Sequence, residues 1–258
     1  MLIDSHFHVF KAAEIDQALS RYTVNYDAPL ETWRSLAVQH GLSAGVIVQP
    51  SFLGLNNDHM LQVIASAPEN LRGIAVVAPS ASLEALEALQ ARGVEGIRLN
   101  LSGEASPTET LRNHLALTEH LAALGMHLQI HHDEGHLNEL LLAIPAGVGV
   151  VIDHFGRPES LGELRSCERA IHSHQGNLWV KLSAPYRSAK LNHRDIFRFW
   201  LEAIGETRLL WGSDWPHTRF ETATSYAEQV RALYDLTSDT QLIEQILSNN
   251  PKTLYWRG

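Results

Sequence analysis

The stretch IDSHFHV, residues 3–9, has the composition of a short buried strand and carries two histidines at its end. Nearly continuous hydrophobicity of this kind is typical of parallel strands that are buried on both faces. Seven further runs share it: AGVIVQPS from Ala44, LRGIAVVAP from Leu71, VEGIRLNL from Val94, HLQIHH from His127, GVVIDHFG from Gly149, LWVKLSAP from Leu178 and LLWGSDWP from Leu209.

Helical patterns separate these runs. ASLEALEALQARG starts at a predicted N-cap, Ser82, and SPTETLRNHLALTEHLAALG reads as one helix with Ser106 as N-cap, Pro107 at the first position and Gly125 as the stop. Eight β/α units in 258 residues predict an α/β fold, a (β/α)8 TIM barrel, as a single domain over residues 1–258. The alternative is an open doubly wound sheet, but the glycine-rich turn that usually follows its first strand is missing.

The composition argues against a protein that binds nucleic acid and against a membrane protein. The chain has 20 Lys and Arg against 29 Asp and Glu, a formal net charge of -9, and no basic cluster, which argues against a nucleic-acid partner. A single cysteine, no signal-peptide pattern and no apolar run long enough for a membrane span predict a cytoplasmic protein without a membrane partner. The sequence leaves monomer and homodimer open.

Polar residues gather where the predicted strands end, which in a TIM barrel is the face that carries the active site. His6 and His8 are two residues apart, so they share one face of the first strand. His131 ends the fifth strand, His154 follows the sixth and Asp214 follows the eighth. If the barrel forms, these side chains surround one point.

Three motifs carry a family resemblance: the His6-x-His8 pair, DHFGRP at 153–158 and GSDWPH at 212–217. Together they resemble the amidohydrolase superfamily, and within it the amidohydrolase-2 branch of metal-independent lactonases, typified by the 2-pyrone-4,6-dicarboxylate hydrolases. The resemblance spans the chain from Ile3 to the helix near Leu254. It implies a hydrolase that opens a carboxylate-bearing lactone in aromatic or sugar-acid catabolism.

Two mechanisms fit the predicted site. In the one that the resemblance implies, no metal is present: Asp214 takes a proton from the attacking water, while His6, His8 and His154 polarise the substrate carbonyl. In the alternative, His6, His8, His131 and Asp214 bind one zinc ion, which lowers the pKa of its bound water to about 7.

The resemblance also implies which residues hold the substrate. Arg98, Arg187 and Tyr22 match positions that hold carboxylates, and a guanidinium can bind a carboxylate through two hydrogen bonds. Ser51 and His131 are further candidates for substrate binding. From the residues alone, Arg98 is either an anion clamp or a buried ion-pair partner, and Lys181 is expected to pair with a carboxylate.

One departure from the family pattern leaves the substrate open. The related hydrolases carry a second arginine soon after the segment that matches GIRLN, whereas this chain has none before Arg112, and Arg157 is a possible replacement. A monocarboxylate lactone, a sulfonated muconolactone and a sugar lactone therefore remain candidates. Three other functions also remain: a zinc hydrolase of amides or esters, a zinc-dependent decarboxylase, and a non-catalytic protein that binds small acids.

Overall fold

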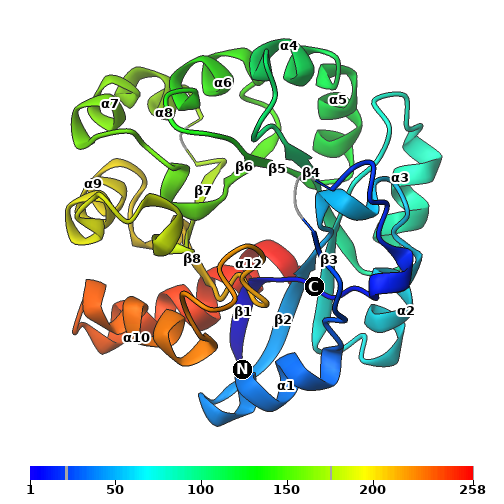
Figure 1. Cartoon of the computed structure of the whole chain (residues 1–258). Coiled ribbons are helices and arrows are strands. Elements are labelled where there is room, and N and C mark those ends of the chain that lie inside the picture. Colours follow the sequence, from blue (N-terminus) through cyan, green and yellow to red (C-terminus); the bar gives the residue numbers. More distant parts are fainter. Residues whose placement is uncertain (21–22, 175, 258) are drawn as a thin grey trace.

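The computed structural model describes residues 1–20, 23–174 and 176–257. Eight parallel strands form one sheet in which each strand pairs with its neighbour in sequence. The strands lie at the centre of the molecule, as predicted for a (β/α)8 barrel (Figure 1). They are β1 (Leu2–Phe7), β2 (Leu42–Val48), β3 (Leu71–Ala75), β4 (Val94–Asn100), β5 (His127–His131), β6 (Gly149–Ile152), β7 (Leu178–Ser183) and β8 (Leu209–Gly212).

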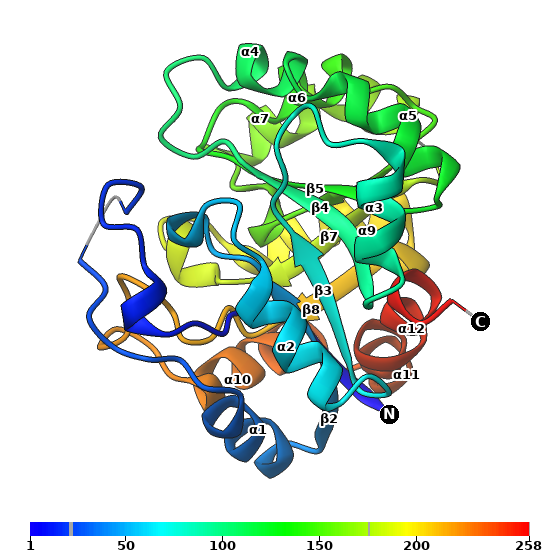
Figure 2. The same ribbon diagram turned by 90° about the vertical axis from the view of Figure 1, so that its right-hand side faces the viewer.

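Helices surround these strands, and the view at right angles shows them on the outside of the barrel (Figure 2). Apolar side chains fill the layer between helices and strands; the ring of Phe7, for example, stacks on Trp33 from α1 with ring centres 3.9 Å apart. The helices are α1 (Leu30–Gln39), α2 (Asp58–Ser66), α3 (Leu83–Gln90), α4 (Pro107–Arg112), α5 (Leu115–Ala123), α6 (Leu137–Ala143), α7 (Leu161–Ser166), α8 (Glu168–Ser173), α9 (His193–Ile204), α10 (Tyr226–Leu236), α11 (Thr240–Glu244) and α12 (Asn250–Tyr255).

The barrel closes between its first and last strands. Phe7 and Trp215 form a parallel bridge, the amide of His8 donates to the Trp215 carbonyl at 2.8 Å, and the amide of Asp214 donates to the His6 carbonyl at 2.8 Å. Gly212 permits this approach, because a Cβ atom there would lie 2.7 Å from the backbone nitrogen of His6. We call this contact between the ends of β1 and β8 the seam. It joins the segment that carries His6 and His8 to the segment that carries Asp214.

The helical stretch 106–125 differs from the prediction of one helix, because it divides into α4 and α5. The Nδ1 atom of His114 lies 2.8 Å from the Thr110 carbonyl oxygen, which an unbroken helix would pair with the His114 amide. That amide instead donates to Leu111 at 2.8 Å. Ser106 precedes α4, but its side chain makes no capping bond, whereas Ser82 caps α3 as predicted by accepting from the Ala85 amide.

Within the described residues, no helix combines the length and the apolar character that crossing a membrane requires.

Candidate active site

Asp214 lies at the centre of the group that the sequence predicted. Its Oδ1 atom is 3.3 Å from His8 Nε2, 3.5 Å from His6 Nε2 and 3.9 Å from His154 Nε2. The carboxylate is 1% exposed, so water is almost excluded from it. The structure thus brings together the four side chains that were expected to be catalytic, from the ends of β1, β6 and β8.

The second oxygen of Asp214 has different neighbours. Oδ2 accepts from Arg187 Nε at 3.0 Å, from Arg187 Nη2 at 2.8 Å and from the Tyr186 hydroxyl at 2.5 Å. Burial raises the pKa of Asp214, but the charge of Arg187 is the largest opposing influence, and the pKa lies well below its usual range. Asp214 is therefore ionised.

Strained backbone holds several of these groups in place. His154, Ala184 and Asp214 have φ angles of 52°, 48° and 57°, in the left-handed region that side chains other than glycine disfavour. Each such residue costs about 1–3 kcal/mol and persists where the surrounding structure enforces it, most often at functional sites. The strain lies on the loops after β6, β7 and β8, which together form the mouth of the barrel.

His8 is oriented by a backbone group. Its Nδ1 atom lies 2.7 Å from the Val48 carbonyl oxygen. A carbonyl can only accept, so Nδ1 carries a proton, and Nε2 can donate to the ionised Asp214 only when it is protonated as well. His8 can therefore donate to a substrate carbonyl only as an imidazolium, a condition that the sequence did not reveal.

A charged network lies beneath the site, inside the barrel. Asp153 Oδ1 is 3.2 Å from His6 Nδ1 and 3.7 Å from Lys181 Nζ, and Asp153 Oδ2 is 3.4 Å from Arg98 Nε. Burial raises the pKa of Asp153, but these contacts with His6, Lys181 and Arg98 outweigh it and hold the pKa well below its usual range. Lys181 also donates to Gln129 at 2.7 Å, and burial lowers its pKa to about 8. The expectation that Lys181 pairs with a carboxylate is confirmed.

The imidazoles around this network are uncharged. Burial lowers the pKa of His6 to about 3, although Asp153 opposes that shift. Burial likewise lowers the pKa of His154 and His131 well below the usual value. The Nδ1 atom of His154 lies 2.9 Å from the Ser183 hydroxyl, which fixes the direction of the ring.

A cavity opens above the carboxylate. Arg98, Arg187, Ser51 and His131, all predicted to bind substrate, line it together with His8, His154 and Asp214. Tyr22 lies outside the described residues. Arg98 combines the two alternatives left open for it, because it pairs with Asp153 and also borders the cavity.

Tyr186 and Arg219 are among the residues of this site that the sequence analysis did not predict. Tyr186 directly precedes Arg187 in the sequence, and its hydroxyl binds Asp214. Arg219 also lines the cavity, and its position five residues after Asp214 was the available signal. Arg157, considered as a replacement for the second arginine, is not among the residues lining this cavity: its Nη1 atom donates to Asp133 at 2.9 Å and to the His132 carbonyl at 3.2 Å.

The donor set also suits a divalent cation. His6 Nε2 is buried and has no hydrogen-bond partner among the described residues. One ligand atom each from His6, His8 and Asp214 lie within 4.8 Å of one another, and the Val48 carbonyl orients His8 as a metal ligand is usually oriented. His131, included in the zinc alternative, belongs to neither of the two potential metal groups found in the described part of the chain.

Comparisons with known proteins identify the family to which the chain is similar. A family model for amidohydrolases matches residues 3–257. A 2-pyrone-4,6-dicarboxylate hydrolase from Comamonas testosteroni is 30% identical over 279 residues, covering 98% of this chain and 90% of the relative. A 4-sulfomuconolactone hydrolase from Rhizobium radiobacter is 29% identical over 268 residues, covering 98% and 89%.

Solved structures show the same likeness. A probable 2-pyrone-4,6-dicarboxylic acid hydrolase from Acinetobacter baumannii, with citric acid bound, superposes with a TM-score of 0.90 at 31% identity, and 99% of each chain is covered. The match of the family model over nearly the whole chain and the 30% identity to a relative settle the classification. The chain belongs to the amidohydrolase family.

Proposed function

We propose that this protein hydrolyses a lactone that carries a carboxylate group. The observation that carries the proposal is that the two carboxylate oxygens of Asp214 have different neighbours. Arg187 and Tyr186 bind Oδ2, whereas Oδ1 faces three imidazoles at the floor of the cavity. An ionised, buried and oriented carboxylate oxygen is suited to accept a proton from water.

The proposed reaction proceeds through one addition and one ring opening. Asp214 Oδ1 takes a proton from water as the water oxygen bonds to the lactone carbonyl carbon. The resulting oxyanion accepts hydrogen bonds from His6 and His154 as Nε2–H tautomers and from His8 as an imidazolium. The ring C–O bond then breaks, and Asp214 returns its proton to the departing oxygen, which becomes a hydroxyl or enol. The new carboxylic acid ionises to a carboxylate by releasing its proton to water.

Two kinds of support favour an anionic substrate. Three guanidinium groups, from Arg98, Arg187 and Arg219, line the cavity, and guanidinium groups bind carboxylates well. The relatives named above act on a pyrone dicarboxylate and on a sulfomuconolactone, and the related Acinetobacter structure contains citric acid. The related hydrolases carry a second arginine after the segment that matches β4, and this chain does not. Arg219 takes its place as a second group that binds a substrate carboxylate.

The test is hydrolysis of 2-pyrone-4,6-dicarboxylate and of 4-sulfomuconolactone, followed by ultraviolet absorbance with metal-free protein. We expect turnover of at least one substrate by wild type, and a loss of about 10²–10⁴-fold in Asp214→Asn because the general base is removed. Asp195→Asn, on the outside of α9, is the matched control and should keep full activity. Equal rates for wild type and Asp214→Asn would refute the proposed base.

A zinc-dependent route is the second candidate, favoured by the unpartnered Nε2 atom of His6. His6, His8 and Asp214 would hold the ion, which when bound would supply an acidic water molecule. Metal analysis of the purified protein distinguishes the routes. On our proposal, chelation leaves the rate unchanged; a rate that falls on chelation and returns only with zinc would replace the metal-free mechanism by the zinc-dependent one.

A further inference from the structure

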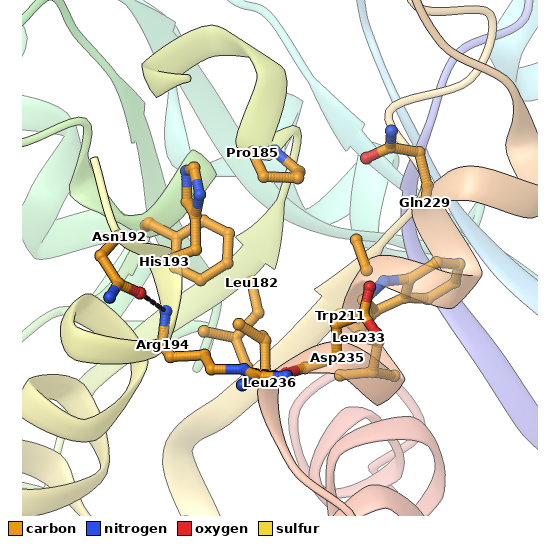
Figure 3. Close-up of a pocket in the computed structure, with 12 residues that line it drawn as sticks. Leu182, Pro185, Asn192, His193, Arg194, Trp211, Gln229, Leu233, Asp235 and Leu236 are labelled. Carbon is orange, nitrogen blue, oxygen red and sulfur yellow. Dashed lines mark hydrogen bonds between the residues drawn. The ribbon is translucent and has the colours of Figure 1, made fainter. Parts of the chain in front are cut away.

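A second cavity lies outside the barrel, between its wall and the helices α9 and α10 (Figure 3). Its volume is about 420 Å³, within the range of about 300–1,000 Å³ that small-molecule sites occupy. Leu182 from β7 and Trp211 from β8 form its inner wall, and Leu233 from α10 lies on the opposite side. The active-site cavity has none of these residues in its lining, so the two cavities are distinct.

The cavity combines apolar and aromatic side chains with polar ones, and the two charged residues in its lining, Arg194 and Asp235, are exposed to solvent. Phe155 and Trp211 are buried, with 3% and 2% of their surface exposed, and the ring of His193 lies 5.3 Å from that of Phe155. Flat rings of this kind pack best against another aromatic ring, edge to face or offset. A charged molecule would lose its hydration here without a buried partner of opposite charge, which is costly.

Two polar atoms in this cavity have no hydrogen-bond partner among the described residues: Gln229 Oε1 and His193 Nε2. Gln229 is 4% exposed, and its amide nitrogen is engaged by Thr224 Oγ1 at 2.6 Å. Figure 3 shows Gln229 extending from α10 with its oxygen directed toward the space beside Pro185. A buried acceptor left in this state destabilises the protein, and a donor from a ligand would supply the missing hydrogen bond.

His193 is the second acceptor. Burial lowers its pKa, so the ring is neutral, and a hydrogen bond with the Pro185 carbonyl opposes that shift. A carbonyl only accepts, so the ring nitrogen that faces Pro185 carries the proton and Nε2 presents a lone pair. Gln229 Oε1 and His193 Nε2 are therefore both free to accept a hydrogen bond from a ligand.

We propose that this cavity is a binding site for a small neutral aromatic molecule that carries an N–H or O–H donor. The ring packs against Phe155, Trp211 and Leu233, and its donor binds Gln229 Oε1 or His193 Nε2. This proposal does not depend on lactone hydrolysis.

The probe is indole, with 1-benzothiophene as an analogue of similar shape that lacks the N–H group. Binding is followed by nuclear magnetic resonance of the tryptophan indole N–H signals in the full chain, with Trp211→Phe used to assign the signal of Trp211. We expect that signal to shift saturably as indole is added. Absence of a saturable shift would overturn the proposal, and the titration itself is carried out on the wild-type protein.

Variants then locate the site. Ala232→Trp fills the cavity and should abolish binding, whereas Ala88→Trp, on the exposed side of α3, should bind indole as wild type does. Gln229→Met removes one acceptor and should raise the dissociation constant for indole about threefold to tenfold, with no change for 1-benzothiophene. Unchanged binding in a folded Ala232→Trp, or equal affinity of wild type for the two probes, would overturn the proposal.

Discussion

The two oxygens of Asp214 are in different surroundings, and this asymmetry decides what the residue can do. Arg187 and Tyr186 bind only Oδ2, so they fix the carboxylate plane and keep it ionised while Oδ1 points at the imidazoles. A base with so low a pKa abstracts protons weakly. A substrate carboxylate that drew Arg187 toward itself would strengthen the base at the moment of binding.

Replacing Arg187 with methionine tests this arrangement. Loss of the guanidinium leaves the buried Asp214 carboxylate without its main cation, so its pKa should rise. A raised pKa keeps the base protonated to higher pH, so the acid limb of the kcat/KM profile should move to higher pH. The measurement is the pH–rate profile on the lactone that wild type hydrolyses.

Arg157→Met is the control for that variant, because Arg157 pairs with Asp133 rather than with Asp214. Its acid limb should coincide with that of wild type. An unmoved acid limb in a folded Arg187→Met would mean that the limb reports a group other than Asp214.

At the scale of residues, the sequence predicted which side chains form the site better than it predicted which of them contact one another. His6, His8, His154 and Asp214 could be grouped because each follows or ends a strand, and strand ends meet at one face of a barrel. The partners of Arg187 could not be predicted, since they depend on loops in which Ala184 and Asp214 adopt positive φ angles. Alanine gives no sequence signal for that conformation, and aspartate gives only a weak one, because it is enriched at positive φ but adopts it at a minority of positions.

At the scale of elements, the strands were predictable because burial on both faces leaves long apolar runs. The division of residues 106–125 into α4 and α5 was not, because the pattern of apolar residues continues through the break. A single side-chain contact, from His114 to the Thr110 carbonyl, accompanies the break. Competition between side chain and backbone for one carbonyl is invisible to hydrophobic periodicity.

The seam between β1 and β8 yields a prediction about Gly212. In Gly212→Ala the new methyl group would press on the backbone of His6, so the strands must separate or the barrel must distort. We expect the free energy of unfolding to fall by about 1–3 kcal/mol, the usual cost of overpacking. Urea denaturation of the variant and of wild type measures this difference.

Gly147→Ala is the matched control, because nothing lies within 4 Å of the added atom and the position is exposed. It should unfold at nearly the same urea concentration as wild type. Equal stability of Gly212→Ala and Gly147→Ala would show that the seam accommodates a side chain.

At the scale of the whole molecule, buried neutral histidines make stability depend on pH. Burial lowers the pKa of His6 to about 3 and that of His132 to about 4, from 6.5 in an exposed imidazole. Below pH 6.5 the unfolded chain therefore binds protons that the folded chain does not, so stability falls as the pH falls. Each of these two groups should cost about 2 kcal/mol between pH 7 and pH 5.

A variant separates this contribution from that of other groups. His132→Phe keeps a ring but cannot titrate, so its unfolding free energy should fall less steeply between pH 6.5 and pH 5, by up to about 1.4 kcal/mol per pH unit. His172→Phe, on the exposed face of α8, should keep the slope of wild type. Urea denaturation at pH 7, 6 and 5 measures the slopes, and identical slopes for all three proteins would contradict the burial of a neutral His132.

The seam at Gly212 also determines when the protein can first work during its synthesis. His6 and His8 leave the ribosome first, and Asp214 emerges only after more than 200 further residues have been added. Every shorter nascent chain would hold the imidazoles without the carboxylate and would lack the last strand that positions it. A ribosome that stalls before residue 214, or a protease that removes the final segment, would therefore leave a product that cannot hydrolyse anything by the proposed route.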